Sequence, residues 1–381
     1  MQIPLSGPDI VKKDIKAVVE VLRTRFLSRG PKVLEFEERI REYVGTKYAV
    51  AVNSGTSALH LIIIGMGLGE GDVVITTPFS FVASSNCILF ERAAPLFVDI
   101  DERTLNLDPD KVEGKLENLS GEELARVKAL LVVDVFGQPA DWDRFKEIGK
   151  KYNLRLIEDS AEVLGSEYNG KRAGGLGEAG VFAFYPNEQI TTGEGGVLVT
   201  DNKELARLAK SMRNQNKGER GEWLDHERLG YNYRMNELSA ALGCSQMERI
   251  EEILNKRNKV AQIYNERLEG IEKVRIPYIA PYVNRMGWFV YVIRLNQEID
   301  RNGVIDYLRE NGVECKPYFT PIHLHPFYRK MFDYKEGDFP VTEDVAEQTI
   351  ALPFFNNLKE EQVDYVVEKL KEGVRRSYFL W

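Results

Sequence analysis

The chain has little cysteine and little histidine: its 381 residues include three cysteines and four histidines. The cysteines, Cys87, Cys244 and Cys315, are far apart and odd in number, so they fit neither a disulfide framework nor the paired spacing of a zinc site. We therefore expect a reducing compartment, the cytoplasm. His323 and His325 lie close together, but the sequence supplies no further ligands beside them, so we expect no metal. His323 is left as a substrate contact or a packed loop residue.

Long hydrophobic runs and basic clusters are also missing. The longest apolar run, ALHLIIIGMGLG, is interrupted by glycine and is shorter than the roughly 18 residues of a membrane span. The N-terminal MQIPLSGPDIVKKDIK has no apolar core of a secretory signal. The net charge is −8, and no stripe of Lys and Arg would neutralise the phosphates of a nucleic acid. We expect neither a membrane nor a nucleic acid as a partner.

Apolar, strand-like segments alternate with helix-period segments over the first 200 residues. We expect strands at 48–52, 72–76, 95–100, 127–137, 154–159, 180–186 and 195–201. Near-continuous apolar strands separated by helices indicate a mostly parallel sheet covered on both faces. The last two strands are too close for a helical crossover, so at least one of them should run antiparallel to its neighbour.

The pattern changes after residue 201. Helices are expected at 203–215, 303–312 and 359–373, with a strand at 288–295 and one long or slightly broken helix over 236–270. A helix of that length commonly bridges two domains. We therefore predict an α/β protein with a large domain over 1–250 and a smaller C-terminal α+β domain over 251–381.

Three loops carry residue types that suit a small anionic ligand. VNSGTSALHL reads as a strand, a turn and a helix, so Gly55 and Thr56 lie at a helix N-terminus, which binds phosphate well; taken alone, an ordinary N-cap is the simpler explanation. LIEDSAE ends a strand with acids, and Asp159 there can pair with a cationic ring nitrogen or be a loop acid. TTGEGG is either a pocket wall or a hairpin-like turn. GMGLGEGD follows a helix and lacks dinucleotide-binding spacing.

The order of these motifs resembles the DegT/DnrJ/StrS-type sugar aminotransferases, pyridoxal phosphate (PLP) enzymes of fold type I. LSRGPKVLEFEERI, VNSGTSALHL, FVDID, IEDSAEVLGSEYNGKRAGGLGEAGVFAFYPN, ITTGEGG and LGYNYRMNELSAALG all match, in order, over nearly the full chain. The resemblance implies a large domain with a mostly parallel sheet, a small C-terminal domain and PLP or pyridoxamine phosphate (PMP) as cofactor. It also implies transfer of an amino group from L-glutamate to a keto group of a nucleotide-linked sugar.

The resemblance also implies roles for single residues. Gly55 and Thr56 would hold the PLP phosphate, Phe81 would stack on the pyridine ring, and Asp159 would pair with its nitrogen. Glu162 would lie near the ring hydroxyl. Ala183 stands where the family often has a serine that contacts the phosphate. Asn232 would reach the phosphate of a neighbouring subunit, which implies a homodimer with shared sites. Tyr318 and His323 match a segment that usually lines the sugar side.

Position 188 departs from the family. The resemblance places the Schiff-base lysine there, and this chain has Glu188. A carboxylate cannot form the covalent link to PLP, and with a reference pKa of about 4.3 it is an anion near neutral pH unless burial raises the pKa. Three interpretations stay open. Glu188 is a laboratory substitution that blocks an aminotransferase, or the chain is a PMP-dependent sugar dehydratase, a branch that carries His there, or it is a silent binding or regulatory homologue.

Overall fold

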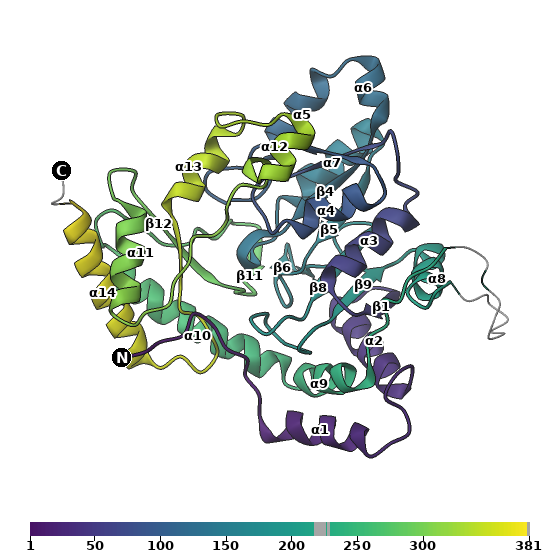
Figure 1. Cartoon of the computed structure of the whole chain (residues 1–381), viewed down its shortest axis with the longest axis horizontal. Helices are drawn as coiled ribbons and strands as arrows, with labels where there is room; N and C mark the ends of the chain where they lie inside the picture. Colours follow the sequence, from purple (N-terminus) through teal and green to yellow (C-terminus); the bar gives the residue numbers. More distant parts are fainter. Residues whose placement is uncertain (217–225, 227–228, 379–381) are drawn as a thin grey trace.

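The computed structural model describes residues 1–216, 226 and 229–378. Figure 1 shows two parts, a large one that holds the N-terminal helices and most strands and a smaller one that holds the C-terminal elements. Helix α10 (Ile250–Leu268) runs along the lower edge from the large part into the small one. The predicted long helix over 236–270 is broken, because α9 (Glu237–Met247) ends just before Arg249, whose backbone is not helical.

A seven-stranded sheet in the order β1-β9-β8-β5-β4-β2-β3 forms the centre of the large part. Its strands are β1 (Tyr48–Val52), β2 (Val73–Thr76), β3 (Ala94–Phe97), β4 (Val127–Val133), β5 (Arg155–Asp159), β8 (Ala179–Ala183) and β9 (Gly196–Thr200). Strand β9 is antiparallel to both β1 and β8, and the remaining pairings are parallel. The predicted mostly parallel sheet, with one reversed strand among the last two, is confirmed.

Helices cover both faces of this sheet. Successive side chains of a strand point to opposite faces, so an apolar strand packs against helices on both sides. In β4, Ala129 and Leu131 pack into the cluster formed with α3 and α4, whereas Leu130 and Val132 pack against the side of α5 and α7. Besides α9, the helices of the large part are α1 (Lys12–Leu22), α2 (Pro31–Val44), α3 (Gly55–Gly65), α4 (Ala83–Phe90), α5 (Pro109–Glu117), α6 (Gly121–Arg126), α7 (Trp142–Tyr152) and α8 (Lys203–Met212).

The predicted strand over 127–137 is much shorter in the structure. The apolar segment 127–137 leaves the sheet after Val133 and forms a turn of 3-10 helix over Val135–Gly137. Phe136 adopts a positive φ of 59° there, so its backbone is not extended. From the sequence alone, its apolar side chain suggests that the strand continues through this residue. This turn brings Phe136 to the boundary between the two parts of the molecule.

The C-terminal part is an α+β unit. An antiparallel sheet β10-β12-β13 packs with α10, α11 and α14 around a separate hydrophobic core. Its elements are β10 (Val274–Arg275), β12 (Tyr291–Leu295), α11 (Arg301–Glu310), a 3-10 turn (Ile322–Leu324), α12 (Pro326–Phe332), α13 (Pro340–Gln348), β13 (Thr349–Leu352) and α14 (Glu360–Tyr378). A small sheet of β6 (Glu167–Tyr168), β7 (Lys171–Arg172) and β11 (Val283–Arg285) joins the two parts. The N-terminal Ile3 also lies in this core and pairs with Val313.

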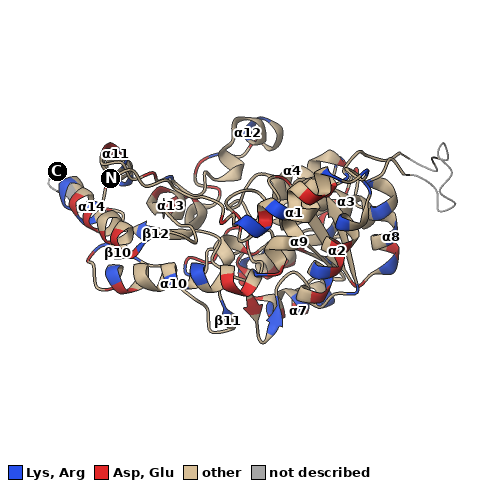
Figure 2. Ribbon diagram, turned by 90° about the horizontal axis from the view of Figure 1, so that it is seen from below, with Lys and Arg blue, Asp and Glu red and all other residues tan. Residues whose placement is uncertain are grey.

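Charges of both signs are interspersed along the helices (Figure 2). Within the described ranges, no helix is both long and apolar enough to cross a membrane. The same residues contain no group of three or more His, Cys, Asp or Glu side chains arranged to hold a metal ion.

Candidate active site

A cavity of about 590 Å³ opens at the carboxyl ends of the parallel strands. Val133, Asp159 and Ala183, the last residues of β4, β5 and β8, all line this main cavity. In open α/β sheets this edge is where ligands bind. Its wall is completed by Ser54, Gly55, Thr56, Leu59, Ser80, Phe81, Ala83, Ser84, Ala161, Glu162, Val181, Tyr185, Asn187, Glu188, Glu194, Gly195, Phe289, Tyr318 and Phe319.

One end of the main cavity is a cradle at the start of α3. Ser54 is the N-cap, and its hydroxyl accepts a hydrogen bond from the Ser57 N–H at 3.1 Å. A Cβ added to Gly55 would lie 2.9 Å from the Cβ of Ala183, so glycine is required for the close approach of the turn to β8. The first N–H groups of a helix have no partner within it. Because Gly55 and Thr56 both line the cavity, these groups suit a phosphate.

The deep wall carries an acid cluster of Asp159, Glu162 and Glu188. The Ser84 hydroxyl donates to Asp159 Oδ2 at 2.7 Å, and burial raises the pKa of Asp159. The backbone N–H of Phe136 donates to Glu162 Oε2 at 2.6 Å, and burial raises the pKa of Glu162 to about 8. Both carboxyls thus lie in surroundings that favour the neutral form until a cationic group approaches.

Glu188 is the third member of the acid cluster. Its backbone closes a turn, with the Glu188 N–H donating to the Tyr185 carbonyl at 3.1 Å. Its side-chain Oε2 is buried and has no hydrogen-bond partner within the described part of the chain. Burial raises the pKa of Glu188 well above its usual range; Glu162 and Asp159 add to this rise, and Arg257 opposes it. A buried polar atom without a partner is costly, so this oxygen is poised for a ligand.

Arg257 on α10 fixes the turn that carries Glu188. Its guanidinium donates to the carbonyls of Asn187 at 3.3 Å and Glu188 at 3.4 Å. It also donates to the carbonyls of Trp288 and Phe289, each at 2.6 Å. Burial lowers its pKa to about 10. Sequence reasoning missed this residue.

The signal that marks Arg257 in the sequence is a charged residue on a buried helical stripe. It follows Ile253 by four residues and precedes Val260 by three, and all three side chains are buried. A charge at such a position requires internal hydrogen-bond partners, because water cannot solvate it.

The other predicted site residues divide between the cavity and its surroundings. Phe81, with 64% of its surface exposed, lines the main cavity, and so does Tyr318, which stacks on Phe319 with ring centroids 5.0 Å apart. Asn232 is exposed and does not line it. His323 is fully buried, and its Nε2 lies 3.0 Å from Glu343 Oε1. That burial favours the packed loop residue over the substrate contact.

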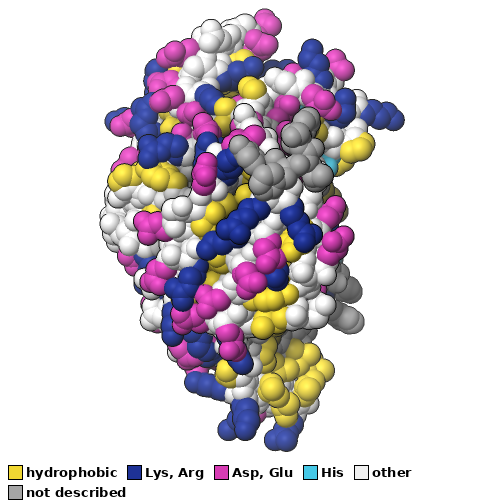
Figure 3. All heavy atoms as spheres, turned by 90° about the vertical axis from the view of Figure 1, so that its left-hand side faces the viewer, with side chains coloured by type: hydrophobic (Ala, Val, Ile, Leu, Met, Phe, Trp, Pro, Cys, Tyr) yellow, Lys and Arg dark blue, Asp and Glu magenta, His cyan; other side chains and the backbone are white. Residues whose placement is uncertain are grey.

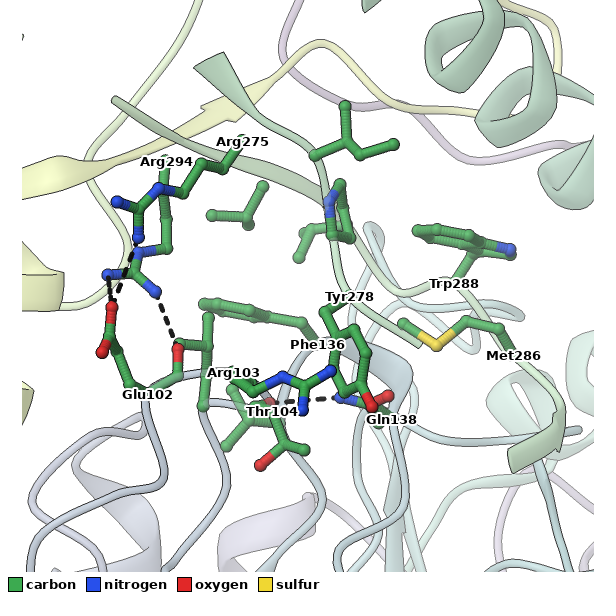
Figure 4. Close-up of a pocket in the computed structure, with 16 residues that line it drawn as sticks. Glu102, Arg103, Thr104, Phe136, Gln138, Arg275, Tyr278, Met286, Trp288 and Arg294 are labelled. Atoms are coloured by element: carbon green, nitrogen blue, oxygen red, sulfur yellow. Dashed lines mark hydrogen bonds and ion pairs between the residues drawn. The ribbon is translucent and has the colours of Figure 1, made fainter. Parts of the chain in front are cut away.

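A second cavity, of about 220 Å³, lies between the two parts of the molecule (Figure 4). Glu102 binds both Arg275 at 3.3 Å and Arg294 at 3.2 Å, so this cavity contains an ion-pair network that links the large part to the C-terminal sheet. Phe136 lines it and stacks on Phe319 of the main cavity, with ring centroids 5.2 Å apart. The turn at Phe136 therefore lines the second cavity and contacts Phe319 and Glu162 in the wall of the main cavity.

The parallel sheet, the acid at the end of β5 and the phosphate-type cradle at α3 define an α/β enzyme of PLP fold type I. The model of the DegT/DnrJ/EryC1/StrS aminotransferase family matches residues 8–371. The chain belongs to this family, which confirms the resemblance seen in its motifs.

Relatives of known name span the same length. The chain is 34% identical to the spore coat polysaccharide biosynthesis protein SpsC of Bacillus subtilis, covering 98% of this chain and 97% of that one. It is also 34% identical to the GDP-perosamine synthase of Caulobacter vibrioides, covering 97% and 98%. Among solved structures, Helicobacter pylori PseC, an aminotransferase in the biosynthesis of pseudoaminic acid, superposes with a TM-score of 0.91 at 29% identity, covering 99% and 100%.

The cofactor class is confirmed as well. A Streptococcus pneumoniae relative, Spr1654, is known in a PLP form and a PMP form, with TM-scores of 0.91 and 0.92 at 26% identity. The PMP form covers 100% of this chain and 99% of that one, and the PLP form covers 99% and 100%. The predicted fold class and the prediction of PLP or PMP are thus both supported by relatives that extend over the whole chain.

Proposed function

We propose that this chain binds PLP or PMP in the main cavity and has the scaffold of a nucleotide-sugar aminotransferase whose catalytic lysine is replaced by Glu188. The substrates of the scaffold are L-glutamate as amino donor and a nucleotide-linked keto-sugar as acceptor. The observation that carries this proposal is the position of Glu188. Its side chain lines the cavity together with Asp159 and Glu162, and the resemblance of the motifs puts the family's lysine at this position.

The described residues fit a phosphorylated pyridine. Gly55 and Thr56 would hold the phosphate at the N-terminus of α3, where a Cβ on residue 55 would fill the cradle. Phe81 would cover one face of the ring. Asp159 would pair with the ring nitrogen and keep it protonated, and the positive charge would in turn favour the ionised carboxylate. Glu162 would lie at the ring hydroxyl, where a neutral carboxyl can donate a hydrogen bond.

When bound, the cofactor supplies an electron sink for the carbon that loses or gains the amino group. The chain's own residues orient it and exclude water. Glu188 lacks the amine that the normal cycle requires for the covalent link and for proton transfer at the substrate carbon. We therefore expect the chain as it stands to bind cofactor and to turn over poorly. Tyr318 lines the main cavity, and we expect it to contact the sugar.

We further propose that the enzyme is a cytoplasmic homodimer. Asn232 is exposed outside the cavity of its own chain, as a residue that serves a neighbouring subunit would be. Helix α1 exposes Ile15, Val19 and Leu22, and Figure 3 shows hydrophobic side chains gathered at the lower end of one face, where α1 lies. Such a patch fits burial by a second copy. The cysteines, all buried and unpaired, fit a reducing compartment.

The decisive experiment replaces Glu188 by lysine. In Glu188→Lys we expect the absorbance of a lysine-linked cofactor on addition of PLP, and amino transfer from L-glutamate to nucleotide-linked keto-sugars. Glu194→Lys is the matched control, because it adds a lysine to the same cavity at another position. It should give neither signal.

Other outcomes would point to another function. If Glu188→Lys forms the linked cofactor but transfers no amino group to any nucleotide-sugar in a panel, the aminotransferase assignment loses its support. Deoxygenation of a keto-sugar by the unaltered chain with PMP would favour a dehydratase. Binding of nucleotide-sugars without turnover, even in Glu188→Lys, would favour a silent homologue.

A further inference from the structure

We infer that Glu188 makes the main cavity selective for PMP over PLP, by forming an ion pair with the protonated aminomethyl group of the bound cofactor. The inference rests on the proposed function, since it assumes that the pyridine ring binds between α3 and Asp159. It goes further in assigning Glu188 a binding role. The side chain would hold by charge the cofactor form that a lysine would otherwise hold by a covalent bond.

The first support is the unpartnered oxygen of Glu188. Its Oε2 is buried without a hydrogen-bond partner within the described part of the chain. Buried carboxyl oxygens are ordinarily satisfied, so this one calls for a hydrogen-bond partner that the ligand brings. The backbone of Glu188 is held by the Tyr185 carbonyl on one side and Arg257 on the other, so the side chain starts from a fixed position.

The second support is the sign of the charge around the site. Among the described residues that line the main cavity, none is lysine, arginine or histidine, whereas Asp159, Glu162, Glu188 and Glu194 are acids. PLP offers an aldehyde oxygen to the acid cluster, and this oxygen carries partial negative charge. PMP offers an ammonium group on the same carbon. A neutral Glu188 could donate only an ordinary hydrogen bond to the aldehyde oxygen of PLP, whereas an ionised Glu188 would form a stronger, charge-assisted pair with the ammonium group of PMP, so the second cofactor form is favoured.

The groups that face Glu188 give the inference a second measurable consequence. They are Glu162, Arg257 and Asp159, and Tyr318 is also within its electrostatic influence. Burial and the two other acids keep the empty Glu188 neutral, with Arg257 opposing them. An ammonium group would ionise Glu188 and expel its proton. Because both cofactor forms present the same ring nitrogen to Asp159, only the difference between PMP and PLP reports on Glu188.

The test measures the affinity of the full-length protein for PMP, PLP and pyridoxine phosphate, which has a neutral hydroxymethyl group instead of the amine. A charge-assisted hydrogen bond corresponds to about a ten- to hundredfold change in Kd. We expect PMP to bind tighter than the other two ligands by that factor. Calorimetry in buffers of different ionisation enthalpy should show about one proton more released with PMP than with PLP.

Two variants complete the experiment. Glu188→Gln should lose the preference for PMP and the extra proton, while its affinity for pyridoxine phosphate stays within about threefold of the unaltered protein. Glu204→Gln removes the same charge from an exposed residue of α8, outside the lining of the cavity, and should keep the preference. Circular dichroism checks that both variants fold.

The inference is overturned if the unaltered protein binds PLP or pyridoxine phosphate as tightly as PMP, or if the preference survives in Glu188→Gln. If the preference is absent but Glu188→Lys forms the lysine-linked cofactor, the proposed function stands and only the role of Glu188 falls. If no ligand binds to the unaltered protein and Glu188→Lys forms no link, both proposals fail.

Discussion

Replacing Glu162 by glutamine should stabilise the protein, and the gain should grow as the pH rises. Burial raises the pKa of Glu162 from 4.5 to about 8, with a smaller contribution from the charge of Asp159. Between these two values the unfolded chain loses the proton that the folded protein keeps. The free energy of unfolding therefore falls with rising pH across this window, because the folded state binds more protons than the unfolded state. Glutamine has no proton to lose, so Glu162→Gln abolishes this pH-dependent fall in the free energy of unfolding.

The magnitude follows from the size of the shift. A change from 4.5 to about 8, at about 1.36 kcal/mol per unit, sets an upper limit of about 5 kcal/mol. The side chain is half-buried, and water screens part of this effect. We therefore expect Glu162→Gln to increase the free energy of unfolding by about 2–3 kcal/mol near pH 8 and to leave it unchanged below about pH 4.5. Glutamine keeps the oxygen that accepts from the Phe136 N–H at 2.6 Å, so this hydrogen bond should remain.

Urea unfolding of the cofactor-free protein, followed by tryptophan fluorescence and far-ultraviolet circular dichroism, measures the difference at a series of pH values. Glu204→Gln provides the control, since it makes the same change at an exposed acid. The free energy of unfolding of Glu204→Gln should stay within about 0.5 kcal/mol of that of the unaltered protein at every pH. The reasoning is refuted if Glu162→Gln gains nothing between about pH 5 and pH 8, or if it is the less stable protein near pH 8.

Further predictions concern the cradle and the turn at Glu188. Gly55→Ala should weaken the binding of PMP at least tenfold and lower the free energy of unfolding by about 1–3 kcal/mol, measured by fluorescence titration and urea unfolding, because its Cβ would lie 2.9 Å from that of Ala183. Gly114 lies in the interior of α5, and no atom lies within 4 Å of a Cβ added there. Gly114→Ala should therefore raise the free energy of unfolding by about 0.5–1 kcal/mol. Arg257→Lys should lower the free energy of unfolding by about 3 kcal/mol, because an ammonium cannot replace the five hydrogen bonds of the guanidinium. An unchanged midpoint of urea unfolding would contradict this prediction.

Most strands of the central sheet could be predicted because they are buried on both faces and are therefore largely apolar, whereas β5 has an apolar centre between Arg155 and the acids Glu158 and Asp159. The same signal misled where an apolar segment leaves the sheet. Residues 134–137 are mostly apolar like β4 before them, but the positive φ of Phe136 ends the strand, and hydrophobicity alone does not show that turn. Strands β6 and β7 have two residues each, which is too short to show an alternation of apolar and polar residues. They pair with each other, and β6 also pairs with β11, more than a hundred residues away.

The candidate site was predictable where its residues belong to local motifs. Gly55 at the start of a helix and Asp159 at the end of a strand carry signals in their own neighbourhoods, and both line the main cavity. Arg257 contacts carbonyls about 70 residues before it and about 30 residues after it, and no short pattern contains that information. His323 remained ambiguous for a similar reason, since its partner Glu343 lies twenty residues further along and its burial depends on packing against Phe339.

The contacts that hold position 188 explain how the scaffold can accept a glutamate where we propose that the family has its lysine. Arg257 binds the carbonyls of Asn187 and Glu188, and the Gln189 side chain binds the carbonyls of Glu162 and Gly287. None of these hydrogen bonds involves the side chain at 188. The backbone therefore directs whichever side chain stands there toward the acid cluster, and the choice between lysine and glutamate changes the chemistry of the cavity while leaving these backbone contacts in place. For this reason Glu188→Lys and Glu188→Gln should change cofactor binding far more than they change folding.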